Sequence, residues 1–166
     1  MSSDTFTTAM FLITAVLAAG VLINAVFPVV YQMAGTFNSA THASDVRLRT
    51  DFSIITTFAG GNPYHGQIWL KNIGSQPVSG AEIQGSDVFF GPVGNFHRLD
   101  QGTTDHGNGY WTYQLSDING NNVWDPGETL EIDAYPGGTA PSSGSYLYFQ
   151  FVLPNGVWRS DQFTGS

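Results

Sequence analysis

The chain has 166 residues, of which 11% are Asp, Glu, Lys or Arg, whereas an average soluble protein has about a quarter. Its net charge is −8 and its basic residues are few and scattered, which excludes a nucleic-acid binder, because neutralising phosphates requires clustered Lys and Arg. A hydrophobic content of 42% excludes a disordered chain, and the absence of Cys excludes disulfides and thiolate chemistry.

The charge is unevenly placed along the chain. No Asp, Glu, Lys or Arg occurs between Asp4 and Asp45, whereas residues 51–166 hold 11 acidic and 3 basic residues. We therefore expect two parts. Residues 1–50 are predicted to form a hydrophobic N-terminal helix for a membrane or a filament core, and residues 51–166 an acidic outer domain.

Residues 9–31 form an apolar run that is long enough to cross a membrane. A helix of about 20 apolar residues spans a bilayer core, and the polar side chains of this run are Thr14, Asn24 and Tyr31. Pro28 has no backbone N–H and leaves the Asn24 carbonyl without its helical partner. We expect a kink there rather than the end of the helix.

Three interpretations compete for this run. The first is a cleaved secretory signal, but such a signal needs a basic segment before the apolar core, and residues 1–10 contain no Lys or Arg. A membrane anchor fits the length, and the acidic domain that follows suggests an outside location. A helix that packs against copies of itself also fits, and the last two are compatible if the chain waits in the membrane before assembly. We expect such a contact to use small or apolar residues: Phe11, Leu12, Ala15, Ala18, Ala19, Leu22 and Ala25.

The helix is predicted to extend beyond the apolar run. Apolar residues recur at the three- and four-residue spacing of an amphipathic helix: Met33, Phe37, Ala40, Ala43 and Val46. A continuous helix over residues 5–48 would be about 65 Å long, roughly twice the thickness of a bilayer core. Gly35 and the polar residues 36–39 offer a point where it could break. A stalk or an assembly helix is favoured over a minimal anchor.

From Asp51 onward the pattern changes to the period of two that is typical of strands. We expect strands at segments bounded by Gly, Pro and Asn: 51–58, 67–73, 87–90, 110–115, 129–134, 145–153 and 157–163. The last two flank Pro154-Asn155-Gly156, and Asn-Gly is a strong hairpin signal. No second helical pattern appears. Short strands over about 115 residues predict an antiparallel, immunoglobulin-like β-sandwich, and the fold class is therefore α+β.

Residues 117–128 match part of the calcium-loop pattern. Oxygen-bearing side chains fall at its positions one, three, five, nine and twelve: Asp117, Asn119, Asn121, Asp125 and Glu128. Asn122 stands where the pattern has glycine, although Asn tolerates the same left-handed backbone. The alternative is a pair of β-turns between two strands, with Trp124 capping the core. Calcium is the one cofactor that the sequence suggests.

The remaining candidates for chemistry form no recognisable site. The His residues lie in different segments, with no two at zinc-ligand spacing: His42, His65, His97 and His106. Asp105 and His106 lie in a Gly-rich segment without a nucleophile motif. Glu128 and Glu131 could be considered as the two carboxylates of a glycosidase. However, Glu131 belongs to the solvent-exposed face of a strand, where such a pair is usually solvated. We therefore expect no enzymatic activity.

Six segments in a fixed order carry a resemblance to a known family: residues 11–25, 30–37, 45–52, 68–75, 86–96 and 124–130. They include Ile68-Trp-Leu-Lys-Asn-Ile-Gly-Ser75 and Trp124-Asp-Pro-Gly-Glu-Thr-Leu130. Through these segments, nearly the whole chain resembles the archaeal flagellin (archaellin) superfamily, and most closely its flagellar accessory protein G branch. The resemblance implies a type-IV-pilin-like N-terminal helix and a C-terminal β-sandwich, in the motility filament (the archaellum) or its anchoring to the cell envelope.

The resemblance also implies a role and partners. Filament subunits of this superfamily carry a basic, glycine-terminated leader, and no Lys or Arg precedes the apolar run here. This favours the accessory branch. We expect a structural component of the archaellum that self-associates through its uncharged N-terminal helix, as a filament subunit or as a filament-associated accessory protein. The expected partners are copies of the chain, other archaellum components, the membrane before assembly and the surface layer. The expected location is the cell surface.

A second hypothesis is a membrane-anchored binding module that holds the apparatus to the surface layer. It would use aromatic residues of the sandwich such as Tyr64, Trp111 and Tyr113, whose alternative role is packing. Deletion of residues 1–50 separates the hypotheses, since a binding module keeps its ligand affinity and a filament component loses self-association.

Overall fold

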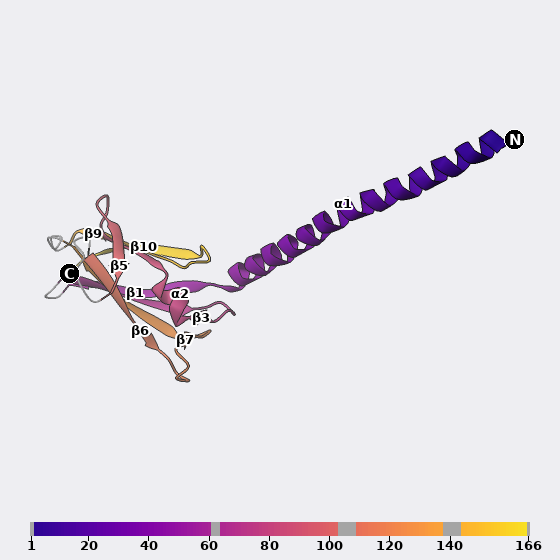
Figure 1. The fold of residues 1–166 in the computed structure, drawn as a ribbon. Helices are drawn as coiled ribbons and strands as arrows, with labels where there is room; N and C mark the ends of the chain where they lie inside the picture. Colours follow the sequence, from indigo (N-terminus) through magenta and orange to yellow (C-terminus); the bar gives the residue numbers. More distant parts are fainter. Residues whose placement is uncertain (1, 61–63, 103–108, 138–143, 166) are drawn as a thin grey trace. The chain divides into compact units, whose positions relative to one another are not determined.

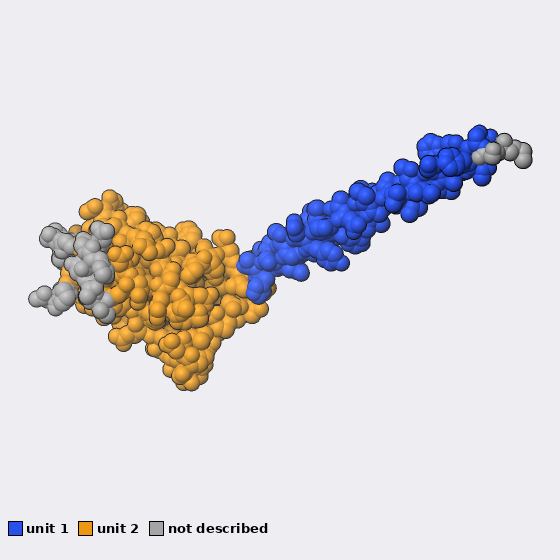
Figure 2. All heavy atoms as spheres, in the orientation of Figure 1, with its two compact units in different colours: residues 1–44 blue, residues 45–166 orange. Residues whose placement is uncertain are grey.

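The chain divides into two compact units, residues 1–44 and residues 45–166 (Figure 2). The computed structural model describes four segments: residues 2–60, 64–102, 109–137 and 144–165. The first unit contains helix α1 (Ser2–Arg49) as far as residue 44, and the second contains residues 45–49 of that helix and a β-domain (Figure 1).

Helix α1 is continuous, as the sequence predicts. It includes both Pro28 and Gly35, so neither residue ends it. Asp4 lies in the first turn and Arg47 and Arg49 in the last turn, where their charges interact favourably with the helix dipole.

The β-domain is built mainly from antiparallel strands. Among the described residues the strands are β1 (Phe52–Gly60), β2 (His65–Asn72), β3 (Val78–Ser79), β4 (Asp87–Pro92), β5 (His97–Gln101), β6 (Gly109–Ser116), β7 (Val123–Trp124), β8 (Thr129–Pro136), β9 (Tyr146–Val152) and β10 (Trp158–Thr164). The main sheet has the order β1-β2-β8-β6-β5-β4-β9-β10, and β3 pairs with β7. Strands β5 and β6 are parallel over two residue pairs, and this short link joins two antiparallel halves.

The two halves pack against each other as the layers of a sandwich. The ring of Phe151 on β9 lies 5.5 Å from that of Phe52 on β1 and 6.2 Å from that of Trp111 on β6. Gly66 on β2 faces Phe90 on β4, and a Cβ at this glycine would lie 2.6 Å from the Phe90 ring. The core therefore consists of interlocking rings from both halves, and the predicted sandwich is confirmed.

Each predicted strand is present, with ends shifted by at most two residues. The hairpin between β9 and β10 is closed by the Gly156 N–H, which donates to the Leu153 carbonyl (2.9 Å). Gly156 has a φ of 81°, a left-handed conformation that glycine adopts without steric cost.

The structure contains a second helix, although no second helical pattern appears in the sequence. A short helix, α2 (Gly80–Gln84), follows β3. Ser79 Oγ accepts from the Glu82 N–H, and Glu82 Oε2 accepts from the Ser79 N–H (2.8 Å). This capping box stabilises a helix too short for a periodic pattern, and its only sequence signal is Ser-x-x-Glu.

Candidate functional site

The surface of helix α1 is apolar and uncovered within the first unit. Every large hydrophobic side chain between Phe6 and Phe37 is at least 48% exposed, and the helix is long and apolar enough to cross a membrane. A continuous apolar surface of this size is strongly unfavourable in water. We therefore expect lipid or other protein molecules to cover it.

The residues predicted for self-association lie on one side of this helix. At about 100° per residue, all seven fall within a sector of roughly 140°. They are Phe11, Leu12, Ala15, Ala18, Ala19, Leu22 and Ala25, and each is exposed. Self-association through this side stays a prediction.

The loop over residues 117–128 is organised around the carboxylate of Asp117. Its Oδ1 accepts from the Gly120 N–H (2.7 Å) and the Asn119 N–H (3.2 Å), and its Oδ2 accepts from the Asn122 N–H (2.6 Å). Asn122 has a φ of 58°, so the left-handed backbone expected at this position is confirmed. The carboxylate holds the turn by occupying backbone donors that would otherwise point to solvent.

Glu128 closes the same loop from its other end. Its Oε1 accepts from the Ile118 N–H (2.9 Å) and its Oε2 from the Asp125 N–H (3.0 Å), and the residue is only 5% exposed. The Glu128 carbonyl also accepts from the Trp124 indole N–H (2.9 Å), and the Asn72 side chain donates to the Trp124 carbonyl (2.9 Å). This buried network connects the loop to β2 and to the core.

Calcium binding by this loop stays a prediction. Asp125 Oδ2 accepts from the side-chain amides of Asn119 (2.7 Å) and Asn121 (2.9 Å), so donors of the loop itself occupy all three carboxylates. No three His, Asp or Glu side chains of the described segments gather as metal ligands would.

The calcium hypothesis predicts that the β-domain melts at a higher temperature in millimolar calcium than in the presence of a chelator, because a ligand that binds only the folded state stabilises it. An unchanged midpoint removes the hypothesis.

The lowered pKa of Asp117 makes the stability of the fold depend on pH. Backbone hydrogen bonds, that from Asn122 above all, lower the pKa of Asp117 below its usual 3.8. A carboxylate whose pKa is lower in the folded than in the unfolded state stabilises the fold fully above the unfolded value. This contribution to stability is lost as the pH falls through the pKa of the folded state. We expect the Asp117 carboxyl carbon to titrate below 3.8 in an NMR pH series; a midpoint at or above that value would contradict the hydrogen bonding described.

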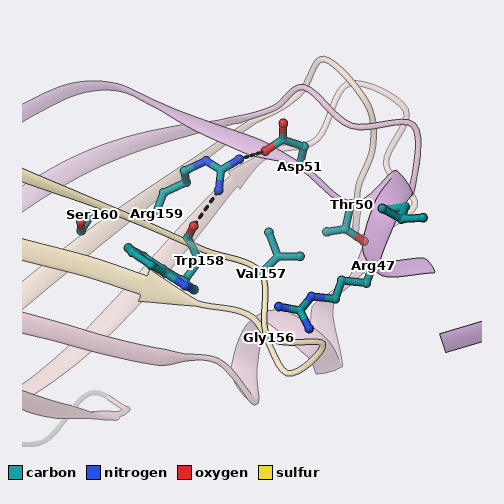
Figure 3. A pocket seen from close by; sticks show the side chains of 9 residues that line it. Arg47, Thr50, Asp51, Gly156, Val157, Trp158, Arg159 and Ser160 are labelled. Carbon is teal, nitrogen blue, oxygen red and sulfur yellow. Dashed lines mark hydrogen bonds and ion pairs between the residues drawn. The ribbon is translucent and has the colours of Figure 1, made fainter. Parts of the chain in front are cut away.

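A hollow of about 660 Å³ lies where α1 ends beside the turn between β9 and β10 (Figure 3). Its lining comes from both segments: Arg47, Leu48, Thr50, Asp51, Gly156, Val157, Trp158, Arg159 and Ser160. The Arg159 guanidinium forms an ion pair with Asp51 and donates to the Trp158 carbonyl (2.8 Å). Arg47 extends toward the Gly156 turn and has no ion-pair partner in the described part of the chain.

The chemistry of this hollow suits an apolar side chain beside an anion. Trp158 is 51% exposed and Leu48 is 85% exposed, and the unpaired guanidinium of Arg47 lies next to them. The sequence analysis did not identify this site. Arg47 and Trp158 are far apart in the chain, and no local motif connects them.

The other candidate residues serve the fold. Trp111 is fully buried in the core, and the Tyr113 hydroxyl accepts from the Gln84 side-chain amide (3.2 Å). The Tyr64 hydroxyl is buried without a hydrogen-bond partner among the described residues, and this burial raises the pKa of Tyr64. The aromatic residues of the second hypothesis therefore do not form a common binding surface.

Among the described residues, the candidate catalytic side chains are not assembled into a site. Glu131 lies on β8, whereas the Glu128 carboxylate is held by the loop described above. The His65 ring stacks on Tyr135 with centroids 5.1 Å apart. The segment with Asp105 and His106 lies outside the described residues.

Comparisons with known proteins agree on one family. The profile of the archaeal-type flagellin family matches residues 5–163. The archaellum periplasmic stator protein FlaG from Sulfolobus acidocaldarius is 28% identical with a TM-score of 0.55, covering 69% of this chain and 99% of that chain. The stator protein complex of FlaF and FlaG from the same organism contains a chain that is 27% identical with a TM-score of 0.55, covering 68% of this chain and 87% of that chain.

A filament structure shares the fold of both parts of the chain. The archaeal flagellum of Methanospirillum hungatei strain JF1 is 16% identical with a TM-score of 0.52, covering 92% of this chain and 91% of that chain. This coverage exceeds the length of the second unit, so the similarity extends into the helix. At this identity the comparison shows a common fold and nothing further.

Proposed function

The chain belongs to the archaeal-type flagellin family, and on this premise we propose that it is a structural component of the archaellum, fixed in the membrane by α1. The single observation that carries the proposal is the uncovered apolar surface of α1, joined to a β-domain of the stator type. The role is mechanical, and it requires no catalytic group.

The length of the apolar run supports membrane insertion. Residues 9–31 span about 34 Å as a helix, which matches a hydrocarbon core of about 30 Å. Thr14 does not oppose insertion, because its hydroxyl donates to the Met10 carbonyl (2.9 Å) within the helix. Residues 32–44 are more polar and uncharged, and they lead from the membrane to the β-domain.

The β-domain supports a stator-type role. It is a separate compact unit with its own hydrophobic core. It also holds most of the acidic residues of the chain, so it is suited to the aqueous space outside the membrane. The hollow beside Trp158 is the proposed contact with another archaellum component or with the surface layer. What supports this contact is the exposed indole next to an unpaired guanidinium.

A filament subunit is the second candidate. The observation that favours it is the match of the archaeal-type flagellin profile to residues 5–163. In that case copies of α1 rather than lipid would cover the apolar surface. Self-association of α1 is compatible with both roles, but recovery of the chain in the filament fits only the second.

Cell fractionation tests the proposal. The full chain and the fragment 51–166 are expressed with the same C-terminal tag in an archaeon that assembles archaella, and filaments are sheared off before membranes are collected. We expect the full chain in the membrane fraction, extractable by detergent, and the fragment in the soluble fraction with a cooperative melting transition. Recovery of the full chain in sheared filaments would establish the second candidate, and recovery in the soluble fraction would contradict both.

A further inference from the structure

Asn24 lies inside the apolar run of α1, and its side-chain amide has no hydrogen-bond partner in the described part of the chain. Thr14, the other polar residue well inside the run, is satisfied by the Met10 carbonyl, and Tyr31 lies at the end of the run, where membrane interfaces favour such rings. Asn24 is about 6 Å along the axis from the centre of the run. Because an amide left unpaired in hydrocarbon is strongly unfavourable, Asn24 requires a partner from outside its own helix.

Pro28 leaves a second unpaired group at the same level. It lies within α1, and because proline has no backbone N–H, the Asn24 carbonyl lacks the donor that would close its helical hydrogen bond. The helix therefore presents a side-chain amide and a backbone carbonyl together. The amide supplies donors and acceptors, and the carbonyl supplies a further acceptor.

The two glycines and the proline of α1 lie on the same side of the helix as Asn24. At about 100° per residue, Gly20, Asn24, Pro28 and Gly35 fall within a sector of roughly 80°, and Gly and Pro are the residue types that least favour a helix. A Cβ at Gly20 or Gly35 would meet nothing within 4 Å, so no contact in the described chain requires glycine there. The missing side chains instead allow a second backbone to approach closely.

The polar groups of this face fit a second copy of the same chain. An amide carries both a partial positive N–H₂ group and a partial negative oxygen, so two Asn24 side chains related by a two-fold axis complement each other. Copies that insert in the same orientation also place Asn24 at the same depth. We propose that α1 pairs with a second copy across the face defined by Gly20, Asn24, Pro28 and Gly35, with the two Asn24 amides hydrogen-bonded to each other. This rests on the membrane placement proposed above.

The proposed contact lies opposite the side predicted from the sequence. Ala15, Ala19 and Leu22 are more than about 130° from Asn24 around the helix axis. In a pair of helices they would face lipid, whereas in a filament core copies of α1 would cover both sides. The face that is covered therefore distinguishes a membrane pair from a filament.

Single-cysteine cross-linking of the full chain in membranes tests the proposal. The chain has no Cys, so every disulfide must come from an introduced residue. Leu17→Cys lies within about 20° of Asn24, and the matched control Leu22→Cys lies on the other side; Leu17 is 65% exposed and Leu22 is 63% exposed. We expect oxidation to give a disulfide dimer with Leu17→Cys at least about five times as efficiently as with Leu22→Cys.

Substitutions of Asn24 in the Leu17→Cys background test the hydrogen bond itself. Asn24→Leu is expected to weaken dimerisation about three- to tenfold, and Asn24→Gln is expected to retain it, because it keeps the amide. Thr14→Val is the matched control and should have no effect, since the Thr14 hydroxyl is satisfied within its own helix.

Three results would overturn the pairing. Equal cross-linking from Leu17→Cys and Leu22→Cys would show that no single face is preferred. Dimerisation that is unchanged by Asn24→Leu would show that the amide does not contribute. No cross-linking, with the chain still in the membrane fraction, would refute the pairing while leaving the membrane anchor intact.

Discussion

The full chain carrying Leu22→Lys is expected to lose its association with membranes, while its β-domain melts at the wild-type temperature. Leu22 lies near the middle of the apolar run and is 63% exposed within the chain. Replacing Leu with Lys at the centre of a membrane helix costs about 3–4 kcal/mol, which lowers the constant for partitioning into the membrane by roughly 150- to 800-fold. Ala19→Glu should have the same effect. The measurement is flotation of the purified chain with liposomes, together with a melting curve followed by circular dichroism.

Leu48→Lys is the matched control for this prediction. Leu48 is 85% exposed, but it lies beyond the apolar run, in the last turn of α1, so this variant should float as the wild type does. Wild-type flotation of the Leu22→Lys chain would refute the account of α1 as a buried helix. A lowered melting temperature in that variant would show instead that the helix supports the β-domain.

The parts of the structure that could be predicted depend on signals local to the sequence. Helix α1 followed from the apolar run over residues 9–31 and from the three- and four-residue spacing of apolar residues beyond it. The strands followed from alternation, and each of these patterns lies within one element. The left-handed backbone at Asn122 was predictable for the same reason. Its φ of 58° follows from a pattern confined to one loop.

The parts that could not be predicted depend on pairings between distant segments. The parallel pair β5–β6 joins only two residues on each strand, and a pairing this short produces no recognisable sequence pattern. The hollow requires Arg47 and Trp158, which only the packing of the β9–β10 turn against the end of α1 brings together. In the loop over residues 117–128, the spacing identified the oxygen-bearing side chains. It did not predict that backbone N–H groups of the same loop would donate hydrogen bonds to their carboxylates.

Trp124→Ala is expected to cause a large loss of stability in the β-domain. The side chain is fully buried, its ring centroid lies 5.8 Å from that of Phe52, and its indole N–H donates to the Glu128 carbonyl (2.9 Å). Removing a buried Trp costs about 3–5 kcal/mol, a large part of the 5–15 kcal/mol that is typical of a domain. We expect the melting temperature of the fragment 51–166 to fall by about 10–20 °C.

Two further variants separate packing from hydrogen bonding in this prediction. Trp124→Phe keeps a ring against Phe52 but removes the indole donor, so its loss should be smaller than that of Trp124→Ala, although still measurable, because the Glu128 carbonyl loses a buried donor. Trp158→Ala removes an indole that is 51% exposed and should cost less than about 1 kcal/mol. If Trp124→Ala cost no more than Trp158→Ala, the loop could not be part of the core.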